Sequence, residues 1–137
     1  NDHVDLAIAC EADGVHVGPK DLPVDFVRRL MPDSIIGAST NNVVEALKAE
    51  SDGATYISVG RLYPTLSKED TRPANLDTLR SVKEAVGLPV CAIGGIGQHN
   101  IDRVLDAGSD MAAVISAVVA AEDVTMAAKV LAERFYS

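Results

Sequence analysis

The sequence predicts an α/β fold of repeated strand–helix units, interpreted as about strands 4–8 of a (β/α)8 TIM barrel with their helices. Short apolar segments alternate with helical segments along the whole chain. A turn that carries Asp beside Gly or Ser precedes three of the apolar segments, at 12–14, 51–54 and 108–110. Because the apolar segments are almost continuously hydrophobic, both faces of the sheet should be covered, which predicts parallel strands joined by right-handed crossovers.

Five strands and six longer helices follow from these patterns. The strands are predicted at 15–17, 34–38, 56–59, 89–93 and 111–115, where β-branched and small apolar residues form short runs. The helices are predicted at 4–12, 21–31, 42–50, 76–86, 100–107 and 124–135, with a short helical turn at 116–120. Pro23 suits a first helical turn, and Asn41 or Asn42 is a suitable N-cap for the third helix.

Two architectures can accommodate such a series: an open doubly wound sheet of the flavodoxin type or a (β/α)8 barrel. The chain of 137 residues begins with a helical segment, which an open five-stranded sheet would leave without a strand. We therefore expect residues 1–137 to form a single domain, the C-terminal five-eighths of a barrel. Five strands alone would expose two parallel edges. About three more strands are thus expected before Asn1, in the same or another chain, and a homo-oligomer stays open.

Composition and charge exclude several classes of function. The formal net charge is −8, which disfavours nucleic acid and anionic membranes as partners but allows a small anionic substrate beside local lysines or a bound cation. No apolar run reaches the ~20 residues of a membrane span, and no signal peptide is visible. Cys10 and Cys91 lack metal-ligand spacing and are expected to be free, buried thiols in a cytoplasmic protein.

The polar stretch 60–70 follows the third strand, at the end of the sheet where α/β enzymes keep their sites. The hydroxyls of Thr65 and Ser67 and the ammonium group of Lys68 are suited to binding a phosphate ester or a pyrophosphate. The alternative interpretation is a solvated connecting loop.

Glycines and a serine follow the last two strands. Residues 94–97 read Gly-Gly-Ile-Gly, and Ile115-Ser116 ends the fifth strand. Such ends let a phosphate approach backbone amides, and loops after the last two barrel strands are the usual phosphate site of this fold. A purely structural turn is the alternative for the glycines.

Two carboxylates, Asp2 and Asp21, lie at adjacent strand ends in this register. A carboxylate pair that faces a pyrophosphate suits Mg2+, which prefers one or two carboxylates together with substrate oxygens. The alternatives are a helix N-cap for Asp21 and a solvated position for Asp2. His16, in the middle of the first strand, fits a hydrogen-bonded structural histidine better than a catalytic one.

Taken together, these strand ends resemble the thiamine-phosphate synthase family. The motifs that carry the resemblance are Asn1-Asp2, Ala12-Asp13-Gly14-Val15-His16-Val17-Gly18 with Asp21, Gly37-Ala38-Ser39, Gly60 with Pro64-Thr65-Leu66-Ser67-Lys68, Ala92-Ile93-Gly94-Gly95-Ile96, and Val114-Ile115-Ser116-Ala117. Six motifs in this order span the chain and make the match specific. The resemblance implies a (β/α)8 barrel enzyme of thiamine biosynthesis, a transferase that joins hydroxymethylpyrimidine diphosphate to thiazole phosphate and releases pyrophosphate.

The resemblance also implies roles for individual residues. It implies that the Mg2+ ligands are Asp2 and Asp21. It implies that the pyrophosphate contacts are Asn1, Ser39 and Lys68, of which Ser39 and Lys68 are the expected catalytic residues. It implies that the thiazole phosphate is held by Thr65, Ser67, Gly95, Ile115 and Ser116, the last three largely through backbone amides.

The sequence departs from the family at three places. A Gln, Arg and Lys motif of the family's second strand is absent, Pro19-Lys20 stands where Gln-Glu is usual, and Arg61 stands where proline is common.

Three other readings stay open. A thiazole tautomerase-like paralogue shares the barrel, but it typically has a histidine two residues after the Ser39 position, where this chain has Asn41. A non-catalytic phosphate-binding barrel remnant would keep the phosphate site alone. A flavin-dependent oxidoreductase would share the Gly-Gly and Ile-Ser signals without explaining Asp2, Asp21 and Lys68 together.

Overall fold

The computed structural model describes residues 1–65 and 72–136, and its centre is a parallel sheet in which the strands follow one another in chain order, β1-β2-β3-β4-β5. The strands are β1 Gly14–Val17, β2 Ile35–Thr40, β3 Tyr56–Val59, β4 Val90–Ile93 and β5 Met111–Ala113. The order excludes the flavodoxin-type alternative, in which the first two strands exchange places. The parallel α/β prediction is confirmed.

Helices follow the strands and cover the outside of the sheet. They are α1 Val4–Ala9, α2 Val24–Leu30, α3 Val43–Ser51, α4 Leu76–Ala85, α5 Ile101–Asp106, α6 Ser116–Val119 and α7 Val124–Glu133, which a short 3-10 turn, η1 Arg134–Tyr136, extends. Asn42 and Asn75 cap α3 and α4, because each side chain accepts a hydrogen bond from a backbone N–H of the first helical turn. Asp123 caps α7 in the same way.

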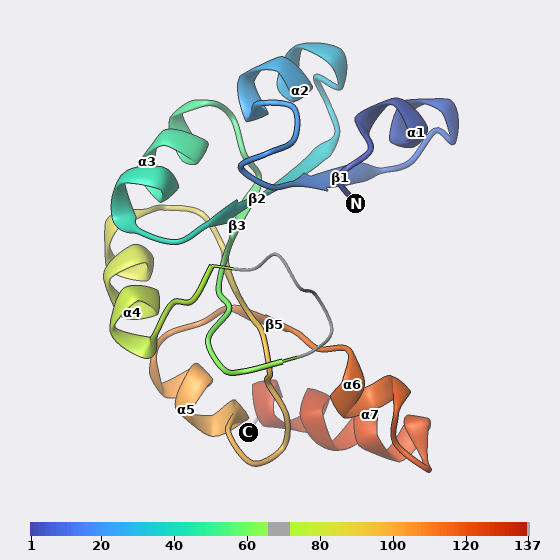
Figure 1. Ribbon diagram of the computed structural model, residues 1–137, viewed down its shortest axis with the longest axis vertical. Helices are drawn as coiled ribbons and strands as arrows, with labels where there is room; N and C mark the ends of the chain where they lie inside the picture. Colours follow the sequence, from blue (N-terminus) through green and yellow to red (C-terminus); the bar gives the residue numbers. More distant parts are fainter. Residues whose placement is uncertain (66–71, 137) are drawn as a thin grey trace.

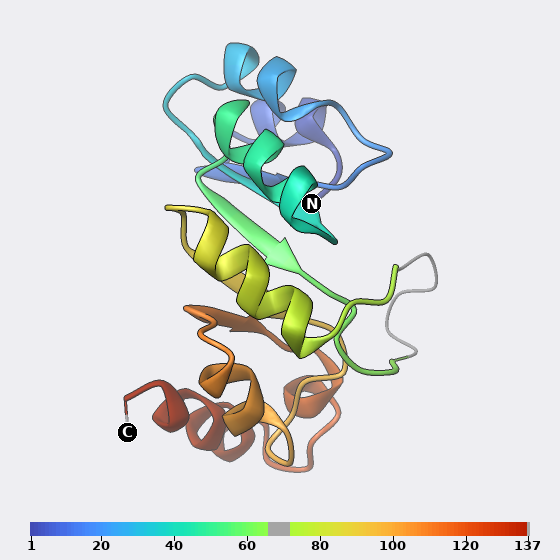
Figure 2. The ribbon, with the colours of Figure 1, turned by 90° about the vertical axis from the view of Figure 1, so that its left-hand side faces the viewer.

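The sheet is curved, and the helices form an arc around it (Figure 1). The arc is open on one side, between α1 and the C-terminal helices α6 and α7. Figure 2 shows β3 between α3 and α4, and residues 60–65 continue beyond the end of that strand. The carboxyl ends of all five strands therefore point toward one edge of the sheet, because the strands are parallel.

The main core lies between the central strands and the helices that cover them. Ile57 and Val59 of β3, Leu79 and Val82 of α4 and Val104 of α5 are completely buried in one cluster. Burial of such side chains stabilises the fold by about 1.5–3 kcal/mol each. This core holds β3 and β4 in place, and with them the carboxyl ends of these strands at the edge of the sheet.

The predicted element boundaries differ from the structure in a few places. The second helix begins at Val24 instead of 21, because residues 18–21 form a turn and Pro23 takes the N-cap position. The fifth strand ends at Ala113 instead of 115, since Ile115 already caps α6. Both cysteines are free, as predicted, but Cys10 is exposed at the end of α1, so the prediction that it is buried is wrong.

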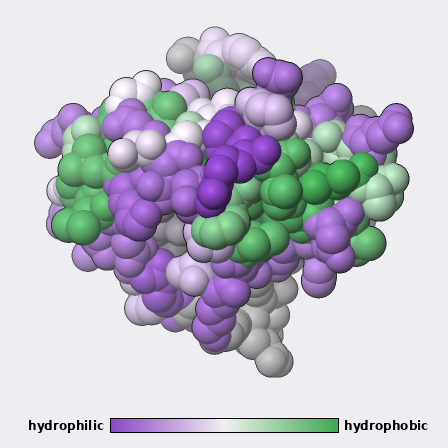
Figure 3. All heavy atoms as spheres, turned by 90° about the horizontal axis from the view of Figure 1, so that it is seen from above, coloured by the Kyte–Doolittle hydropathy of each residue, from purple (hydrophilic) through white to green (hydrophobic). Residues whose placement is uncertain are grey.

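The two edge strands of the sheet, β1 and β5, each have one strand neighbour among the described residues. Exposed hydrophobic side chains gather near the β1 edge, and Figure 3 shows hydrophobic patches on this end of the molecule. They belong to α1 and to α2 with the turn before it: Leu6, Ile8, Leu22, Phe26 and Leu30. Among the described residues no helix is both long and apolar enough to span a membrane.

Candidate functional site

A cleft of about 390 Å3 lies at the carboxyl ends of the five strands. All of the predicted site residues within the described ranges line this cleft: Asn1, Asp2, Asp21, Ser39, Thr65, Gly95, Ile115 and Ser116. They come from every strand end of the sheet, and the cleft brings them together. Ser67 and Lys68 lie outside the described residues, so their positions stay predictions.

The two carboxylates predicted to bind a metal lie at the β1 end of the cleft. The backbone N–H of Asp2 donates to the carbonyl of His16 at 2.9 Å, which ties residue 2 to the edge of β1. Asp21 Oδ2 accepts from the N–H of Gly18 at 2.7 Å. Asp21 therefore closes the turn after β1 and does not cap α2, so the N-cap alternative is wrong. In the described part of the chain, Asp21 Oδ1 has no hydrogen-bond partner.

Asp2 and Asp21 supply two carboxylates to the lining of the cleft, and carboxylates are ligands that Mg2+ prefers. Among the described residues no group of three or more His, Cys, Asp or Glu side chains could hold a metal ion, as a structural zinc site would require. Mg2+ is typically bound by one or two carboxylates with water and substrate phosphate oxygens completing its shell. Asp2 and Asp21 both line the cleft and could contribute such carboxylates.

Ser39 is held by a hydrogen-bond network that spans three strands. Nε2 of His16 lies 2.8 Å from Ser39 Oγ, and Nδ1 of His16 lies 2.8 Å from the hydroxyl of Tyr56. A neutral imidazole has one donor and one acceptor nitrogen, so one hydroxyl donates to the ring and the other accepts. Ser58 adds a longer bond, donating to Ser39 Oγ at 3.4 Å. His16 is therefore a hydrogen-bonded histidine, as predicted, and it fixes the orientation of Ser39.

Gly37 makes this network possible. It lies on β2 in register with His16 of β1 and with Tyr56 of β3. A Cβ on residue 37 would collide with His16 Nδ1 and with the Tyr56 hydroxyl. The His16–Tyr56 bond thus crosses the middle strand through the space that a side chain would fill. Burial raises the pKa of Tyr56 above its ordinary value, which keeps the phenol protonated.

The loop after β3 is anchored to the neighbouring strand end. The N–H groups of Leu62 and Tyr63 donate to the carbonyls of Ile93 and Gly94, each at 3.0 Å. The Asn41 amide donates to the Gly60, Arg72 and Pro73 carbonyls at 3.0–3.4 Å, at both ends of the segment that begins with Gly60. These bonds fix the place where the loop leaves the sheet and the place where it returns.

The β4–β5 end of the cleft presents backbone more than side chains. Gly94 and Gly95 have φ values of 100° and 63°, in the left-handed region that glycine adopts without strain. A Cβ on Gly95 would lie 2.6 Å from the carbonyl oxygen of Pro64, so the close approach of the β3 loop also requires glycine. Asn100 fixes the following turn, since its Oδ1 accepts from Gly97 N–H at 2.8 Å and its Nδ2 donates to the Gly95 carbonyl at 3.0 Å.

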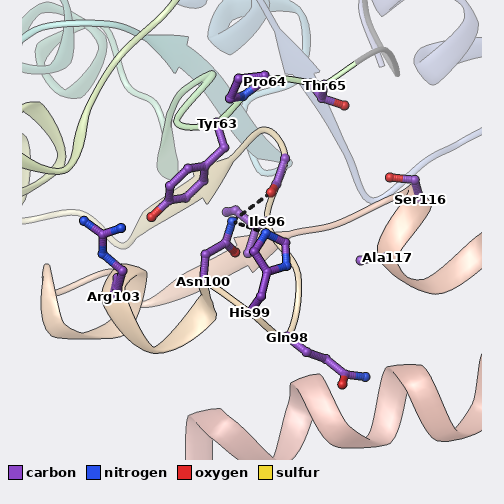
Figure 4. Close-up of a pocket in the computed structure, with 11 residues that line it drawn as sticks. Tyr63, Pro64, Thr65, Ile96, Gln98, His99, Asn100, Arg103, Ser116 and Ala117 are labelled. Carbon is purple, nitrogen blue, oxygen red and sulfur yellow. Dashed lines mark hydrogen bonds between the residues drawn. The ribbon is translucent and has the colours of Figure 1, made fainter.

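A second, wider cavity of about 1070 Å3 lies beside this end of the cleft and shares Thr65, Gly95, Ile96 and Ser116 with it. In Figure 4, Thr65 and Ser116 lie on one side of this cavity and Arg103 on the other. The hydroxyl of Tyr63, on the Arg103 side, is buried and is the one such side-chain atom without a hydrogen-bond partner among the described residues. The wall between cleft and cavity is thus a thin turn that Asn100 holds.

Among the described residues, three cationic side chains line the cleft that the expected site residues did not include: Lys20, Arg61 and Arg72. Arg72 forms a bidentate pair with Glu45, with N–O distances of 2.7 and 2.8 Å. The Arg72 hydrogen bond holds the pKa of Glu45 below its ordinary value, and the same bond raises the pKa of Arg72. Arg61 could have been predicted, since it follows β3 directly. Arg72 could not, because it lies beyond the stretch 60–70 and does not directly follow a strand.

Comparison with known proteins identifies the family to which this chain is similar. The family model described as thiamine monophosphate synthase matches residues 1–118. The thiamine-phosphate synthase of Chloroflexus aurantiacus is 51% identical over 132 residues, which cover 96% of this chain and 61% of the relative. That of Methanocella arvoryzae is 53% identical over 131 residues, covering 94% of this chain and 62% of the relative. The chain thus spans less than two thirds of the length of these relatives.

Solved structures show the same relation. The thiamine phosphate pyrophosphorylase from Pyrococcus furiosus superposes with a TM-score of 0.90 at 45% identity, over 98% of this chain and 65% of that one. A 3-hexulose-6-phosphate synthase superposes with a TM-score of 0.70 at 20% identity, over 96% of this chain and 66% of that one. The second likeness shows a shared fold alone. This protein is therefore a parallel α/β structure with TIM-barrel-like neighbours.

Proposed function

This chain belongs to the thiamine monophosphate synthase family, and from that premise we propose that the protein is a thiamine-phosphate synthase. The reaction joins hydroxymethylpyrimidine diphosphate to thiazole phosphate and releases pyrophosphate. The observation that carries the proposal is the single cleft lined by all the described residues that the reaction needs. The two ends of the cleft suit two anionic groups. At β1, carboxylates suit a pyrophosphate that is bound through a metal ion. At β4 and β5, backbone amides suit a phosphate.

The proposal includes a complete (β/α)8 barrel. We place β1 to β5 at strands 4–8 of the barrel, with residues 1–137 as its C-terminal five-eighths and single domain. Two observations support this: the strands follow one another in chain order, and the relatives are longer than this chain. The exposed hydrophobic side chains beside β1 are a suitable surface for further strands and helices of the barrel.

The proposed metal is Mg2+, held by Asp2 and Asp21. Mg2+ bound there would neutralise charge that develops on the departing pyrophosphate. Asp21 is already oriented for this by its bond to Gly18. Ser39, fixed by His16, and the amide of Asn1 would donate hydrogen bonds to pyrophosphate oxygens at the same end of the cleft. Lys68 is proposed to complete this end with a positive charge.

The second substrate is proposed to bind through its phosphate at the β4–β5 end. Thr65 and Ser67 would donate their hydroxyls, and Gly95, Ile115 and Ser116 would donate backbone N–H groups. A phosphate held there would fix the thiazole ring above the centre of the sheet, between the two ends of the cleft. The enzyme thereby brings two substrates into one geometry, which lowers the entropic barrier of their reaction.

The chemical step needs positioning and electrostatics. The lone pair of the thiazole nitrogen forms the new C–N bond, the C–O bond to the pyrophosphate breaks, and the pyrophosphate leaves with that electron pair. Ser39 and Lys68 would stabilise the leaving group, as a preorganised site does for developing charge, and Asp2 and Asp21 would hold the cation that supplies further positive charge there. No protein nucleophile takes part in this scheme. His16 serves as a positioning residue because both of its ring nitrogens are engaged by hydroxyls.

The proposed partners are the two small-molecule substrates, with neither nucleic acid nor a membrane. The location is proposed to be cytoplasmic, in keeping with two free cysteines. The oligomeric state stays open.

The tautomerase-like alternative finds less support. Asn41 occupies the position at which that relative has a histidine. Its amide is neither protonated nor deprotonated near neutral pH, and its Nδ2 donates to three carbonyls of the β3 loop. The residue holds the loop and has no capacity for acid–base chemistry.

The direct test mixes the protein with both substrates and Mg2+ and follows pyrophosphate release. We expect release with the wild type and a loss of roughly 100-fold or more in the Lys68→Ala variant, as for removal of one group that stabilises developing charge. Lys129→Ala is the matched control, because Lys129 is exposed on α7 and pairs only loosely with Glu133. Full activity of Lys68→Ala would refute the role of Lys68, whereas no release by the wild-type protein with its barrel complete would refute the function.

A further inference from the structure

Two arginines line the cleft, and they differ in what they bind. The guanidinium of Arg72 is neutralised by the bidentate pair with Glu45. Arg61 lies at the end of β3, the central strand, and its side chain has neither an ion pair nor a hydrogen bond in the described part of the chain. In a protein with a net charge of −8, a half-buried cation without a counter-ion is unusual. Its position in the cleft suggests that a ligand supplies the anion.

The backbone of Arg61 is held on both sides. Its N–H donates to the carbonyl of Arg72 and its carbonyl accepts from the N–H of Ala74, each at 2.8 Å. This ladder fixes the Cα of Arg61 in the mouth of the cleft. The side chain therefore leaves from a defined point, and a smaller part of its conformational entropy is lost when it binds an anion.

The stem of Arg61 packs toward β4. A Cβ on Gly94 would lie 2.7 Å from the Cα and 2.8 Å from the Cγ of Arg61. Only glycine at position 94 leaves room for this stem, which passes over the first residue after β4. Arg61 follows β3, so it lies one strand from β4 and two strands from β1, where Asp2 and Asp21 lie. Neighbouring strands are about 4.8 Å apart, so Arg61 is nearer to the β4–β5 end of the cleft.

We propose that Arg61 is a substrate-binding residue that pairs with the phosphate monoester of the thiazole substrate. The proposal rests on the proposed function and adds to it a side-chain cation at an end of the cleft that otherwise presents mostly backbone. A guanidinium can donate two parallel N–H hydrogen bonds to a phosphate and also carries a positive charge. Backbone amides donate hydrogen bonds without that charge. The contact would set the affinity for the phosphorylated thiazole and would reject the unphosphorylated alcohol.

The test compares Arg61→Gln and Arg61→Lys with the wild type. We expect Arg61→Gln to raise the KM for thiazole phosphate by about tenfold or more. The KM for the pyrimidine diphosphate should stay within about twofold, because that substrate binds two strands away. Arg61→Lys keeps the charge and the packing on Gly94 and should recover part of the loss. Arg80→Gln is the control, because Arg80 lies on α4, pairs with Asp77 and is absent from the cleft lining.

A binding measurement separates this proposal from the proposed function. Titration of the protein with inorganic phosphate, followed by calorimetry, should show at least about tenfold weaker binding to Arg61→Gln than to the wild type and Arg80→Gln. Unchanged phosphate affinity, or a KM increase confined to the diphosphate, would overturn the proposal. Weaker phosphate binding in a protein that forms no product would uphold Arg61 and refute the synthase function instead. Thermal unfolding of each variant shows that the comparison is made on folded protein.

Discussion

The two ends of the cleft recognise anions by different means. At the β1–β2 end, side chains carry the chemistry: Asp2, Asp21 and Ser39, with His16 behind the serine. At the β4–β5 end, the chain turns at Gly94 and Gly95 and presents its backbone. A side-chain site is weakened when an atom is removed, whereas a backbone site is weakened when an atom is added. Mutations of opposite kinds therefore test the two ends.

The largest effect is expected at the metal end, from Asp21→Asn. The amide oxygen can still accept from Gly18, so the turn should survive while a negative ligand is lost. Loss of a cation that stabilises a leaving group is worth several kcal/mol, which corresponds to roughly a thousandfold in kcat. Titration of the rate with Mg2+ should show a higher half-saturating concentration. Asp77→Asn, on the exposed face of α4, is the control. An unchanged Mg2+ response would remove Asp21 from the metal site.

The next effect is expected at the backbone end, from Gly95→Ala. The left-handed φ of 63° costs about 1–2 kcal/mol for an L-residue. The new Cβ would also meet the Pro64 carbonyl at 2.6 Å and push the β3 loop away. A displacement of about 1 Å in a positioned site costs about 100-fold, here in kcat/KM for thiazole phosphate. Gly97→Ala, whose Cβ would have only ordinary contacts of 3.4 Å or more, should be nearly silent. Equal losses in the two variants would contradict the backbone role.

A smaller effect is expected from removing the support of Ser39. His16→Ala deletes the bond to Ser39 Oγ and should lower kcat/KM for the diphosphate by about tenfold, the worth of one good hydrogen bond. The KM for thiazole phosphate should not change. Tyr56→Phe removes only the outer bond, at Nδ1, and should have a weaker effect of the same kind. If both KM values rose together, His16 would be maintaining the sheet instead of positioning the serine.

The smallest effect concerns the Glu45–Arg72 pair and stability. The folded-state pKa of Glu45 is lowered from its ordinary value of 4.5, first by the hydrogen bond from Arg72. A lowered folded pKa stabilises the protein fully above the unfolded pKa, and this stabilisation is lost as the pH falls through the folded pKa. The side chains of Arg72 and Glu45 are 46% and 35% exposed. Glu45→Gln should therefore lower the free energy of unfolding by less than about 1 kcal/mol near pH 7. Urea unfolding should show this difference shrinking below about pH 4.5; a difference independent of pH would contradict it.

Much of the fold could be predicted from the sequence because the strands are short, apolar and separated by turns. The run at 56–59 was predicted with its observed bounds. Strand ends then located the cleft, since parallel strands bring their carboxyl ends to one edge. The bond by which Asp21 closes the turn after β1 could not be predicted, because an aspartate before Leu-Pro fits a cap and a turn equally well.

The hydrogen bonds within the cleft could not be predicted from the sequence, because they join residues that are far apart in the chain. His16 and Tyr56 are 40 positions apart, and their bond depends on the register of three strands. Arg72 follows a stretch with no periodic pattern, so nothing local indicates that Asn41 and Glu45 hold it. Long-range pairing of polar groups is decided by packing, and the hydrophobic pattern of the sequence does not record it.

Because Gly37 has no side chain, His16 and Tyr56 meet above it, and the residues at these three positions on three strands depend on one another. A side chain at 37 is compatible with the fold only if both His16 and Tyr56 move or become smaller, and a smaller residue at either position leaves space that Gly37 does not fill. Positions 16, 37 and 56 should therefore change together among related proteins. An inherited substitution at one of them should be accompanied by another within the same triad.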